Sequence, residues 1–325
     1  MPSAQGPSAV QLGSLLISPP LINSSCPWAS SLAQLTELYE CPYTGAVTIR
    51  TSTPHGFQED SSHSHTLFGE SSINSYGFSP VSVGQYLIWI EMIHDMSTKR
   101  KPWLISIGGP ETDLEYCFEH ISCLLSRRPD IPIGIELNLS CPNIPSHPPP
   151  AYSGLELAAI CELVSSWKER QKGITVGIKI PPYTHSGMYD TLFSALLGAA
   201  AGTIDYVAAT NTLGNSILPS SIDTTLPSGK GEGPVFMGGM AGSALHPLSL
   251  GVVRNLRTRL REQEYNGGHL RNIKIIGIGG VSDREGFERM RYVGADVVAV
   301  ATALGREGVD VFQKVLEGQI SKDGK

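Results

Sequence analysis

The segment ELNLSCPN, residues 136–143, gathers the side chains best suited to chemistry. Cys141 lies at the C-terminal end of a predicted strand, and a cysteine so placed can act as a nucleophile or, less often, as a general base. Asn138 and Asn143 offer amide donors and acceptors to a planar polar ligand. A lone cysteine is more often a small buried hydrophobe, but the polar residues around Cys141 favour a reactive site.

Two glycine-rich segments predict loops through which the backbone approaches a ligand closely. Residues 273–280 read IKIIGIGG, and the next apolar run ends in Ala-Thr-Ala at 301–303. Backbone N–H groups in such loops can bind a phosphate, although tight turn packing without a ligand would use the same glycines. Residues 236–242, FMGGMAG, indicate either a second close approach to a cofactor or a flexible loop.

These segments need a framework to position them, and the sequence alternates strand and helix patterns. Short β-branched or apolar runs predict eight strands, at residues 21–24, 46–51, 103–107, 134–139, 175–180, 206–210, 273–278 and 297–301. Runs with 3.6-residue periodicity predict helices at 30–40, 83–96, 113–127, 154–170, 189–200, 247–263, 283–294 and 309–318. Eight such units favour an α/β fold of the (β/α)8 TIM barrel type, with an open doubly wound sheet as the alternative. We expect a single domain over residues 1–325, with loose ends at 1–10 and 320–325.

Three polar stretches exceed what a minimal barrel needs: residues 52–80, 142–152 and 211–244. Each follows a predicted strand, so in this fold they would form long loops at the C-terminal mouth, where barrel enzymes carry their active sites. The first stretch contains His55, His63 and His65, which we interpret as residues of a solvated loop rather than as metal ligands.

Composition and charge argue against several functions. The 325 residues carry a formal net charge of −6 and no run rich in Lys and Arg, so we expect no nucleic-acid partner. No apolar run approaches the roughly 20 residues that cross a bilayer, and the absence of Lys and Arg before Arg50 argues against a secretory or mitochondrial leader. The six cysteines lack metal-ligand spacing, so we expect free thiols, no metal and a soluble, intracellular protein.

Six motifs together resemble one enzyme family. ELNLSCPN, VGIKIPPYT, ATNTLGNS, GGMAG, IIGIGGV and VATALGREG occur in this order, and from about residue 12 to 320 the sequence resembles the dihydroorotate dehydrogenases. Cys141 is similar to the cysteine of the class 1 enzymes, and KIPPY is similar to class 1A. The resemblance implies a cytoplasmic homodimer, without a membrane partner, that oxidises (S)-dihydroorotate to orotate in pyrimidine biosynthesis and passes the electrons to fumarate.

The resemblance also implies that the cofactor is FMN, with its phosphate on the loops after the seventh and eighth strands. Lys179 would contact the flavin and, as a fixed cation, would favour its anionic reduced form. The cofactor-binding residues implied by the resemblance are Ser24, Ser25, Asn138, Lys179, Gly239, Gly279, Gly280, Ala301, Thr302 and Ala303.

For the substrate, the resemblance implies Cys141 as the general base, which would remove a proton from carbon 5 while hydride leaves carbon 6. Arg50 and Lys179 would be further catalytic residues. The substrate-binding residues implied are Arg50, Asn74, Tyr76, Gly77, Phe78, Asn138, Asn143, Asn211 and Thr212. The loop after Cys141 would close over the substrate and exclude water.

Three residues depart from the family pattern near the expected substrate. Arg50 replaces a lysine, Tyr76 replaces a smaller residue, and Cys26 replaces a glycine beside the flavin. Arginine keeps the charge of lysine but not its geometry, although it can pair bidentately with a carboxylate. Three alternatives therefore stay open: an FMN oxidoreductase acting on another dihydro-heterocycle, a flavin-binding protein without catalysis, and a barrel lyase or isomerase that binds a phosphorylated substrate.

Overall fold

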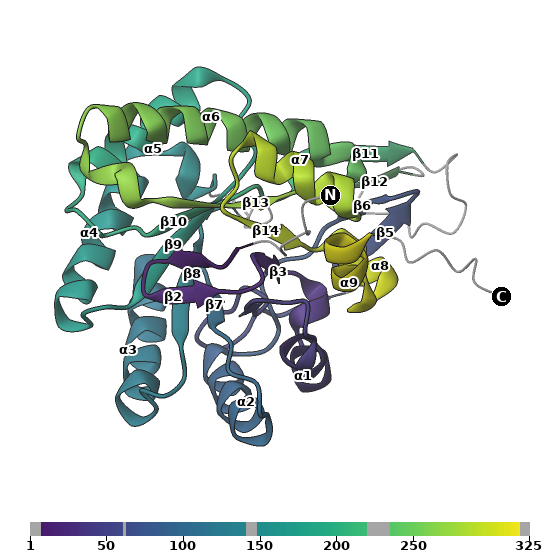
Figure 1. Ribbon diagram of the computed structural model, residues 1–325, viewed down its shortest axis with the longest axis horizontal. Coiled ribbons are helices and arrows are strands. Elements are labelled where there is room, and N and C mark those ends of the chain that lie inside the picture. The colour runs from purple at the N-terminus through teal and green to yellow at the C-terminus, as the bar shows by residue number, and fades with distance from the viewer. Residues whose placement is uncertain (1–7, 61–62, 141–147, 220–234, 319–325) are drawn as a thin grey trace, which may run out of the picture.

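The computed structural model describes residues 8–60, 63–140, 148–219 and 235–318. Its centre is an eight-stranded parallel sheet with the hydrogen-bonded order β3, β14, β13, β10, β9, β8, β7 and β4. Helices surround this sheet on its outside (Figure 1). The predicted (β/α)8 barrel is therefore confirmed.

The predicted strands and helices are all present. The barrel strands are β3 (Leu21–Asn23), β4 (Val47–Thr48), β7 (Trp103–Ile107), β8 (Ile133–Asn138), β9 (Thr175–Ile180), β10 (Tyr206–Ala209), β13 (Lys274–Ile278) and β14 (Val297–Val300). The main helices are α1 (Leu32–Glu40), α2 (Val83–Met96), α3 (Glu111–Arg127), α4 (Gly154–Arg170), α5 (Ser186–Gly198), α6 (His246–Tyr265), α7 (Arg284–Val293) and α9 (Asp310–Glu317). A further short helix, α8 (Thr302–Glu307), follows β14 where only the end of a strand was expected.

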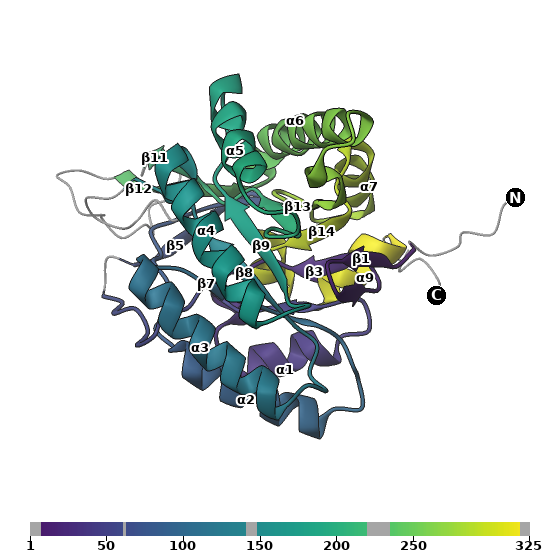
Figure 2. The same cartoon turned by 90° about the vertical axis from the view of Figure 1, so that its left-hand side faces the viewer.

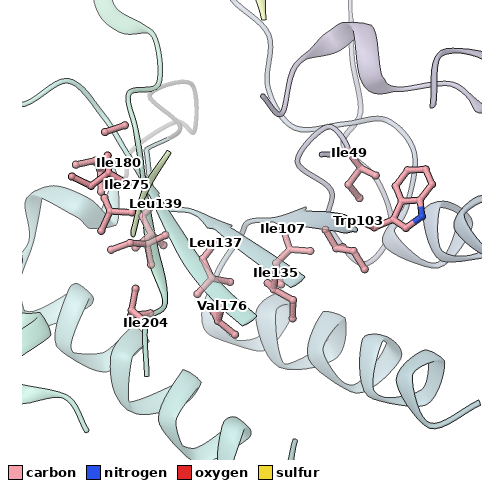
Figure 3. Close-up of a cluster of buried hydrophobic side chains, with 14 of the residues drawn as sticks. Ile49, Trp103, Ile107, Ile135, Leu137, Leu139, Val176, Ile180, Ile204 and Ile275 are labelled. Atoms are coloured by element: carbon pink, nitrogen blue, oxygen red, sulfur yellow. The ribbon is translucent and has the colours of Figure 1, made fainter. Parts of the chain in front are cut away.

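Successive side chains of the barrel strands point to two separate cores. On β8, Ile135 and Leu137 pack outward against the helices, whereas Glu136 and Asn138 face the barrel interior. Figure 3 shows this outer core, where Ile135 and Leu137 lie near Val176 of β9 above a surrounding helix. One face of each strand is buried against the helices and the other against the barrel interior, so the sequence of such a strand is a nearly continuous apolar run. This is why the sequence predicts these strands well.

A β-hairpin that the sequence did not predict fills the N-terminal end of the barrel. β1 (Val10–Leu12) pairs antiparallel with β2 (Leu15–Ile17). Leu12, Leu15 and Ile17 are buried together with inward-facing strand residues such as Leu104 and Tyr206. The hairpin therefore closes this end of the barrel with apolar side chains.

The barrel closes between β3 and β4, two strands that share no ladder of their own. The Gly45 N–H, just before β4, donates to the Leu21 carbonyl at 2.8 Å. The side chain of Asn23 also bonds the backbone of Thr48. Side-chain and loop contacts thus complete the ring that the strands leave open.

Two of the three stretches expected as long loops contain strands. β5 (His65–Phe68), β6 (Ser71–Asn74), β11 (Leu213–Pro219) and β12 (Val235–Gly242) form an antiparallel sheet in the order β11, β12, β6 and β5. The hairpin β1–β2 and this four-stranded sheet lie at opposite ends of the barrel (Figure 2). The prediction of loops throughout 52–80 and 211–244 is therefore wrong. The reason is that β6 pairs with β12, so that residue 74 lies opposite residue 239, and no local pattern reveals a pairing over such a distance.

Of the predicted loose ends, residues 1–7 and 320–325 lie outside the described residues. The prediction is wrong for Val10, which begins β1 and pairs with Ile17. Within the described ranges, no helix combines the length and the apolar character needed to cross a bilayer.

Candidate active site

A cavity opens at the C-terminal end of the barrel, between the strand ends and the four-stranded sheet. The space between its walls, including solvent at the open mouth, is about 1140 Å³. Its walls come from the ends of β3, β4, β8, β9, β10, β13 and β14 and from β5, β6 and β12. Active sites of (β/α)8 barrels lie at this end.

A chain of hydrogen bonds holds the polar side of the cavity. Asn138 donates from Nδ2 to Thr51 Oγ1 at 2.9 Å and accepts at Oδ1 from the Ser140 hydroxyl at 2.7 Å. Asn211 donates from Nδ2 to Ser140 Oγ at 2.7 Å, and the hydroxyls of Ser25 and Thr51 lie 3.0 Å apart. Because each amide is held by its neighbours, Asn138 and Asn211 face the cavity in fixed orientations.

Lys179 on β9 brings a buried ammonium group to the cavity wall. Lys179 is 3% exposed. Its Nζ donates to Ser24 Oγ at 3.1 Å and to the Ser25 carbonyl at 3.4 Å. Glu136 lies deeper in the barrel, where it accepts from the Ser106 hydroxyl at 3.3 Å. Burial raises the pKa of the Glu136 carboxyl, and the charge of Lys179 offsets part of this rise. An ammonium held by neutral oxygens beside a cavity can still bind an anionic or electron-rich ligand.

The loops after β13 and β14 form an end of the cavity lined by backbone. Gly279 and Gly280 have φ angles of +135° and +69°, which glycine adopts readily. A Cβ added to Gly280 would lie 2.7 Å from the Gly242 carbonyl oxygen. Among the described residues, the backbone N–H groups of Gly280, Val281 and Thr302 find no hydrogen-bond partner. Free N–H groups on two such loops suit an anion.

The glycines of β12 allow the neighbouring chain segments to approach closely. A Cβ on Gly238 would lie 2.2 Å from the Asn74 carbonyl oxygen of β6, and a Cβ on Gly239 would lie 2.1 Å from Thr212 Oγ1. The alternative of a flexible loop at 236–242 is therefore wrong, because glycine here lets two strands approach. Gly242 lines the cavity, whereas Gly239 does not. The contact of Gly239 with a cofactor stays a prediction.

Arg50, one of the three departures, already has partners inside the protein. Nη2 lies 2.5 Å from Glu59 Oε1 and 3.3 Å from the Gly77 carbonyl oxygen. The guanidinium carbon also lies 5.1 Å from the centre of the Tyr76 ring, within the range of a cation–π interaction. Arg50 therefore lines the cavity with part of its charge already balanced.

Tyr76 belongs to an aromatic wall that also contains residues not predicted as part of the site. Its hydroxyl lies 2.8 Å from His65 Nδ1, and His65 meets Trp28 edge-on with ring centres 5.6 Å apart. Burial raises the pKa of the Tyr76 phenol, although Arg50 lowers it, so the phenol is neutral. His65 is exposed, as expected for a solvated residue, but the prediction of a loop is wrong for it, because the pairing of β5 with β6 places it on a strand, opposite Asn74 at the cavity.

Cys26, the third departure, is 6% exposed and also lines the cavity. Burial raises the pKa of its thiol to about 11, although the charges of Lys179 and Arg50 lower it. The thiol is therefore neutral at physiological pH. Among the described residues, no group of three His, Cys, Asp or Glu side chains is arranged to hold a metal ion.

Most residues predicted for the site lie together in this cavity. Those that line it are Ser24, Ser25, Arg50, Asn74, Tyr76, Gly77, Phe78, Asn138, Lys179, Asn211, Thr212, Gly279, Gly280, Ala301, Thr302 and Ala303. Cys141 and Asn143 lie outside the described residues. The sequence missed Trp28, His65, Glu70, Ser72 and Leu245, which line the cavity too. No motif marks them, and for His65 and Ser72 only the long-range strand pairing brings them there.

Comparison with known proteins gives one consistent result. The family model described as "Dihydroorotate dehydrogenase" matches residues 11–322. The protein named "Dihydroorotate dehydrogenase A (fumarate)" of Lactococcus lactis subsp. lactis (strain IL1403) is 27% identical over 300 residues, 92% of this chain and 88% of that protein. The "Dihydroorotate dehydrogenase (fumarate)" of Saccharomyces paradoxus is 27% identical over 299 residues, 91% of this chain and 87% of that protein.

Proposed function

The chain belongs to the dihydroorotate dehydrogenase family, and from this premise we propose that it oxidises (S)-dihydroorotate to orotate with FMN as cofactor and fumarate as electron acceptor. One observation carries the proposal. A buried cation, a fixed pair of amides and a backbone-lined end meet in one cavity at the C-terminal side of the barrel. Fumarate is proposed because the similar proteins carry it in their names.

The cavity fits FMN in two respects. The free N–H groups of Gly280, Val281 and Thr302 suit a phosphate, and the Lys179 ammonium suits the electron-rich end of a flavin ring. The residues proposed to hold FMN are Ser24, Ser25, Asn138, Lys179, Gly279, Gly280, Ala301, Thr302 and Ala303. When bound, FMN would supply the hydride-accepting chemistry that no amino-acid side chain provides.

The side chains around the cavity would orient the substrate ring and move one proton. Asn138 and Asn211 would bind the polar edges of the ring through their amide groups, because the Ser140 hydroxyl keeps both amides in place. Arg50 would bind the ring carboxylate through the guanidinium N–H groups that Glu59 and Gly77 do not use. We assign removal of the carbon-5 proton to Sγ of Cys141, since the ordinary pKa of a thiol, about 8.5, lies close to working pH.

Anaerobic spectroscopy of the holoenzyme tests the proposal. The protein, loaded with FMN, should show flavin absorption that dihydroorotate bleaches and fumarate restores. Failure to bind FMN would contradict the cofactor and with it the whole proposal. A flavin that dihydroorotate never bleaches would contradict the substrate and favour either another dihydro-heterocycle or a binder without catalysis. If dihydroorotate bleaches the flavin but fumarate does not reoxidise it, only the proposed electron acceptor would be contradicted.

We also propose that the enzyme is a homodimer in the cytoplasm, as the resemblance to class 1A implies. Sedimentation of the holoenzyme should then give twice the mass of one chain. A mass of one chain across the micromolar range would contradict the dimer without affecting the proposed reaction.

A further inference from the structure

We propose that Glu59 occupies the position on the Arg50 guanidinium where the carboxylate of a ring ligand would otherwise bind. Glu59 thereby weakens the binding of carboxylated rings relative to the binding of uncharged rings. This inference rests on the proposed function, because it assumes that a pyrimidine enters the cavity. It makes Glu59 a specificity-determining residue, although neither its sequence position nor any motif marks it.

The first support is the geometry of the pair. Glu59 Oε1 lies 2.5 Å from Arg50 Nη2, and the two side chains are 28% and 7% exposed. A charge-assisted hydrogen bond of this kind, partly shielded from water, is stronger than one between neutral groups. Separating the pair is unfavourable, because it leaves the buried Arg50 guanidinium without its charged partner. A ligand carboxylate must therefore compete with Glu59 for the same guanidinium.

The second support is that Glu59 is held in place. Phe57, two residues before Glu59, donates its backbone N–H to the Ser79 carbonyl at 2.7 Å. The Phe57 ring fills the space beside Gly77, where an added Cβ would lie 2.4 Å from it, and it packs edge-on against Phe78 with ring centres 6.3 Å apart. The backbone that carries Glu59 is thus anchored next to Gly77, the residue whose carbonyl also binds Arg50.

The third support is that Arg50 is held from the other side. The Tyr76 ring lies under its guanidinium, and Tyr76 is itself hydrogen-bonded to His65. With Glu59, Tyr76 and Gly77 around it, the guanidinium keeps one orientation and meets ligands only at its remaining N–H groups. An uncharged ring can accept a hydrogen bond there without displacing Glu59. A carboxylated ring meets the Glu59 carboxylate as well, which is unfavourable for two like charges.

Binding of two related pyrimidines to the FMN-loaded protein tests the inference. Orotate carries a ring carboxylate and uracil does not. In Glu59→Gln, the Kd of orotate should fall by about tenfold or more, as expected when a charged hydrogen bond to Arg50 becomes available, while the Kd of uracil should change by less than about threefold. Asp60→Asn removes the same formal charge one residue away and should leave both constants within about threefold.

An unchanged ratio of orotate to uracil affinity in Glu59→Gln would overturn the inference, as would an equal effect of Asp60→Asn. Glu59→Ala serves as a second variant if the glutamine variant folds poorly. Reaction of Arg50 with phenylglyoxal, followed by peptide mass spectrometry, gives a readout without any pyrimidine. It should be faster in Glu59→Gln than in Asp60→Asn, and equal rates would overturn the inference. If neither pyrimidine binds, the proposed function fails, and the phenylglyoxal rates still decide the role of Glu59.

Discussion

The side-chain amide of Asn23 bonds both backbone groups of Thr48, as a neighbouring strand would. Nδ2 donates to the Thr48 carbonyl at 2.6 Å, and Oδ1 accepts the Thr48 N–H at 2.9 Å. Both residues are buried, and they lie between β3 and β4, where the ring of strands has no direct pairing. One side chain therefore replaces a rung of the barrel ladder.

Asn23→Ala should lower the free energy of unfolding by about 2–4 kcal/mol, because two buried backbone groups lose their partners. Urea denaturation followed by circular dichroism measures this loss. The control is Gln11→Ala, which removes an exposed side chain and should stay within about 0.5 kcal/mol of the wild type. A variant at position 23 that unfolds at the same urea concentration as the wild type would show that β3 and β4 need no such bridge.

Lys179→Met should weaken FMN binding by about 10- to 100-fold, since a buried charged donor at the cavity is lost. Titration of the apoprotein with FMN, followed by quenching of flavin fluorescence, measures the dissociation constant. Lys172→Met removes the same charge from an exposed position near the start of the same strand and should bind FMN as the wild type does. Equal affinities of the two variants would exclude Lys179 as a cofactor ligand.

Cys141→Ala should slow anaerobic bleaching of the flavin by dihydroorotate by about 10²- to 10⁴-fold, the usual contribution of a general base. FMN affinity should not change, because the thiol is proposed to act on the substrate. Stopped-flow absorption measures the rate, and Cys123→Ala, at an exposed cysteine on α3, provides the control. Bleaching at the wild-type rate would refute Cys141 as the base.

Cys26 should resist alkylation at pH 8 although it lines the cavity. With a pKa of about 11, only about one thiol in a thousand is ionised at that pH, and the thiolate is the reactive form. The rate should rise about tenfold for each pH unit between 8 and 10. Iodoacetamide labelling followed by mass spectrometry compares Cys26 with the exposed Cys123 in the same sample. Equal labelling of the two at pH 8 would contradict this prediction.

His94 should make the protein less stable in mild acid. Its imidazole is buried between Asp130 (Nε2 to Oδ2, 3.3 Å) and Tyr39 (Nδ1 to OH, 3.3 Å). Burial lowers its pKa below 6.5, Arg100 lowers it further, and Asp130 opposes both. The unfolded state therefore binds more protons below pH 6.5, so the free energy of unfolding falls as the pH drops from 6.5 to 5.

In His94→Gln this fall should be smaller, because the titrating group is gone. The control is His185→Gln, at an exposed position, which should keep the wild-type dependence on pH. Urea titrations at pH 5.0 and 6.5 measure the difference for all three proteins. An equal loss of stability in the wild type and His94→Gln would assign the acid sensitivity to other groups.

The barrel could be predicted because each of its strands carries its own signal. A strand such as β9 is apolar on the face that meets the helices and ends at the cavity, so period-two alternation also places Lys179 on the inner side. The same reasoning places Asn138 at the end of β8. Residues on barrel strands were therefore predicted together with the strands that carry them.

The wall formed by β5 and β6 could not be predicted in this way. These four-residue strands contain His, Ser, Thr and Asn, and their stability comes from pairing with β12 far along the chain. His65 reaches the cavity only through this pairing. Glu59 lies in no regular element, and it contacts Arg50, nine residues earlier in the chain. Such contacts arise from tertiary structure alone, so local sequence patterns carry no sign of them.

The hairpin β1–β2 closes the end of the barrel opposite the cavity mouth. Because Leu12, Leu15 and Ile17 fill the opposite end of the barrel, a molecule in the described part of the cavity enters and leaves through the same mouth. Under the proposed function, orotate must then depart before fumarate can reach the flavin. The steady-state kinetics should accordingly follow a ping-pong scheme, with parallel double-reciprocal lines and with each substrate competing against the product of the other half-reaction.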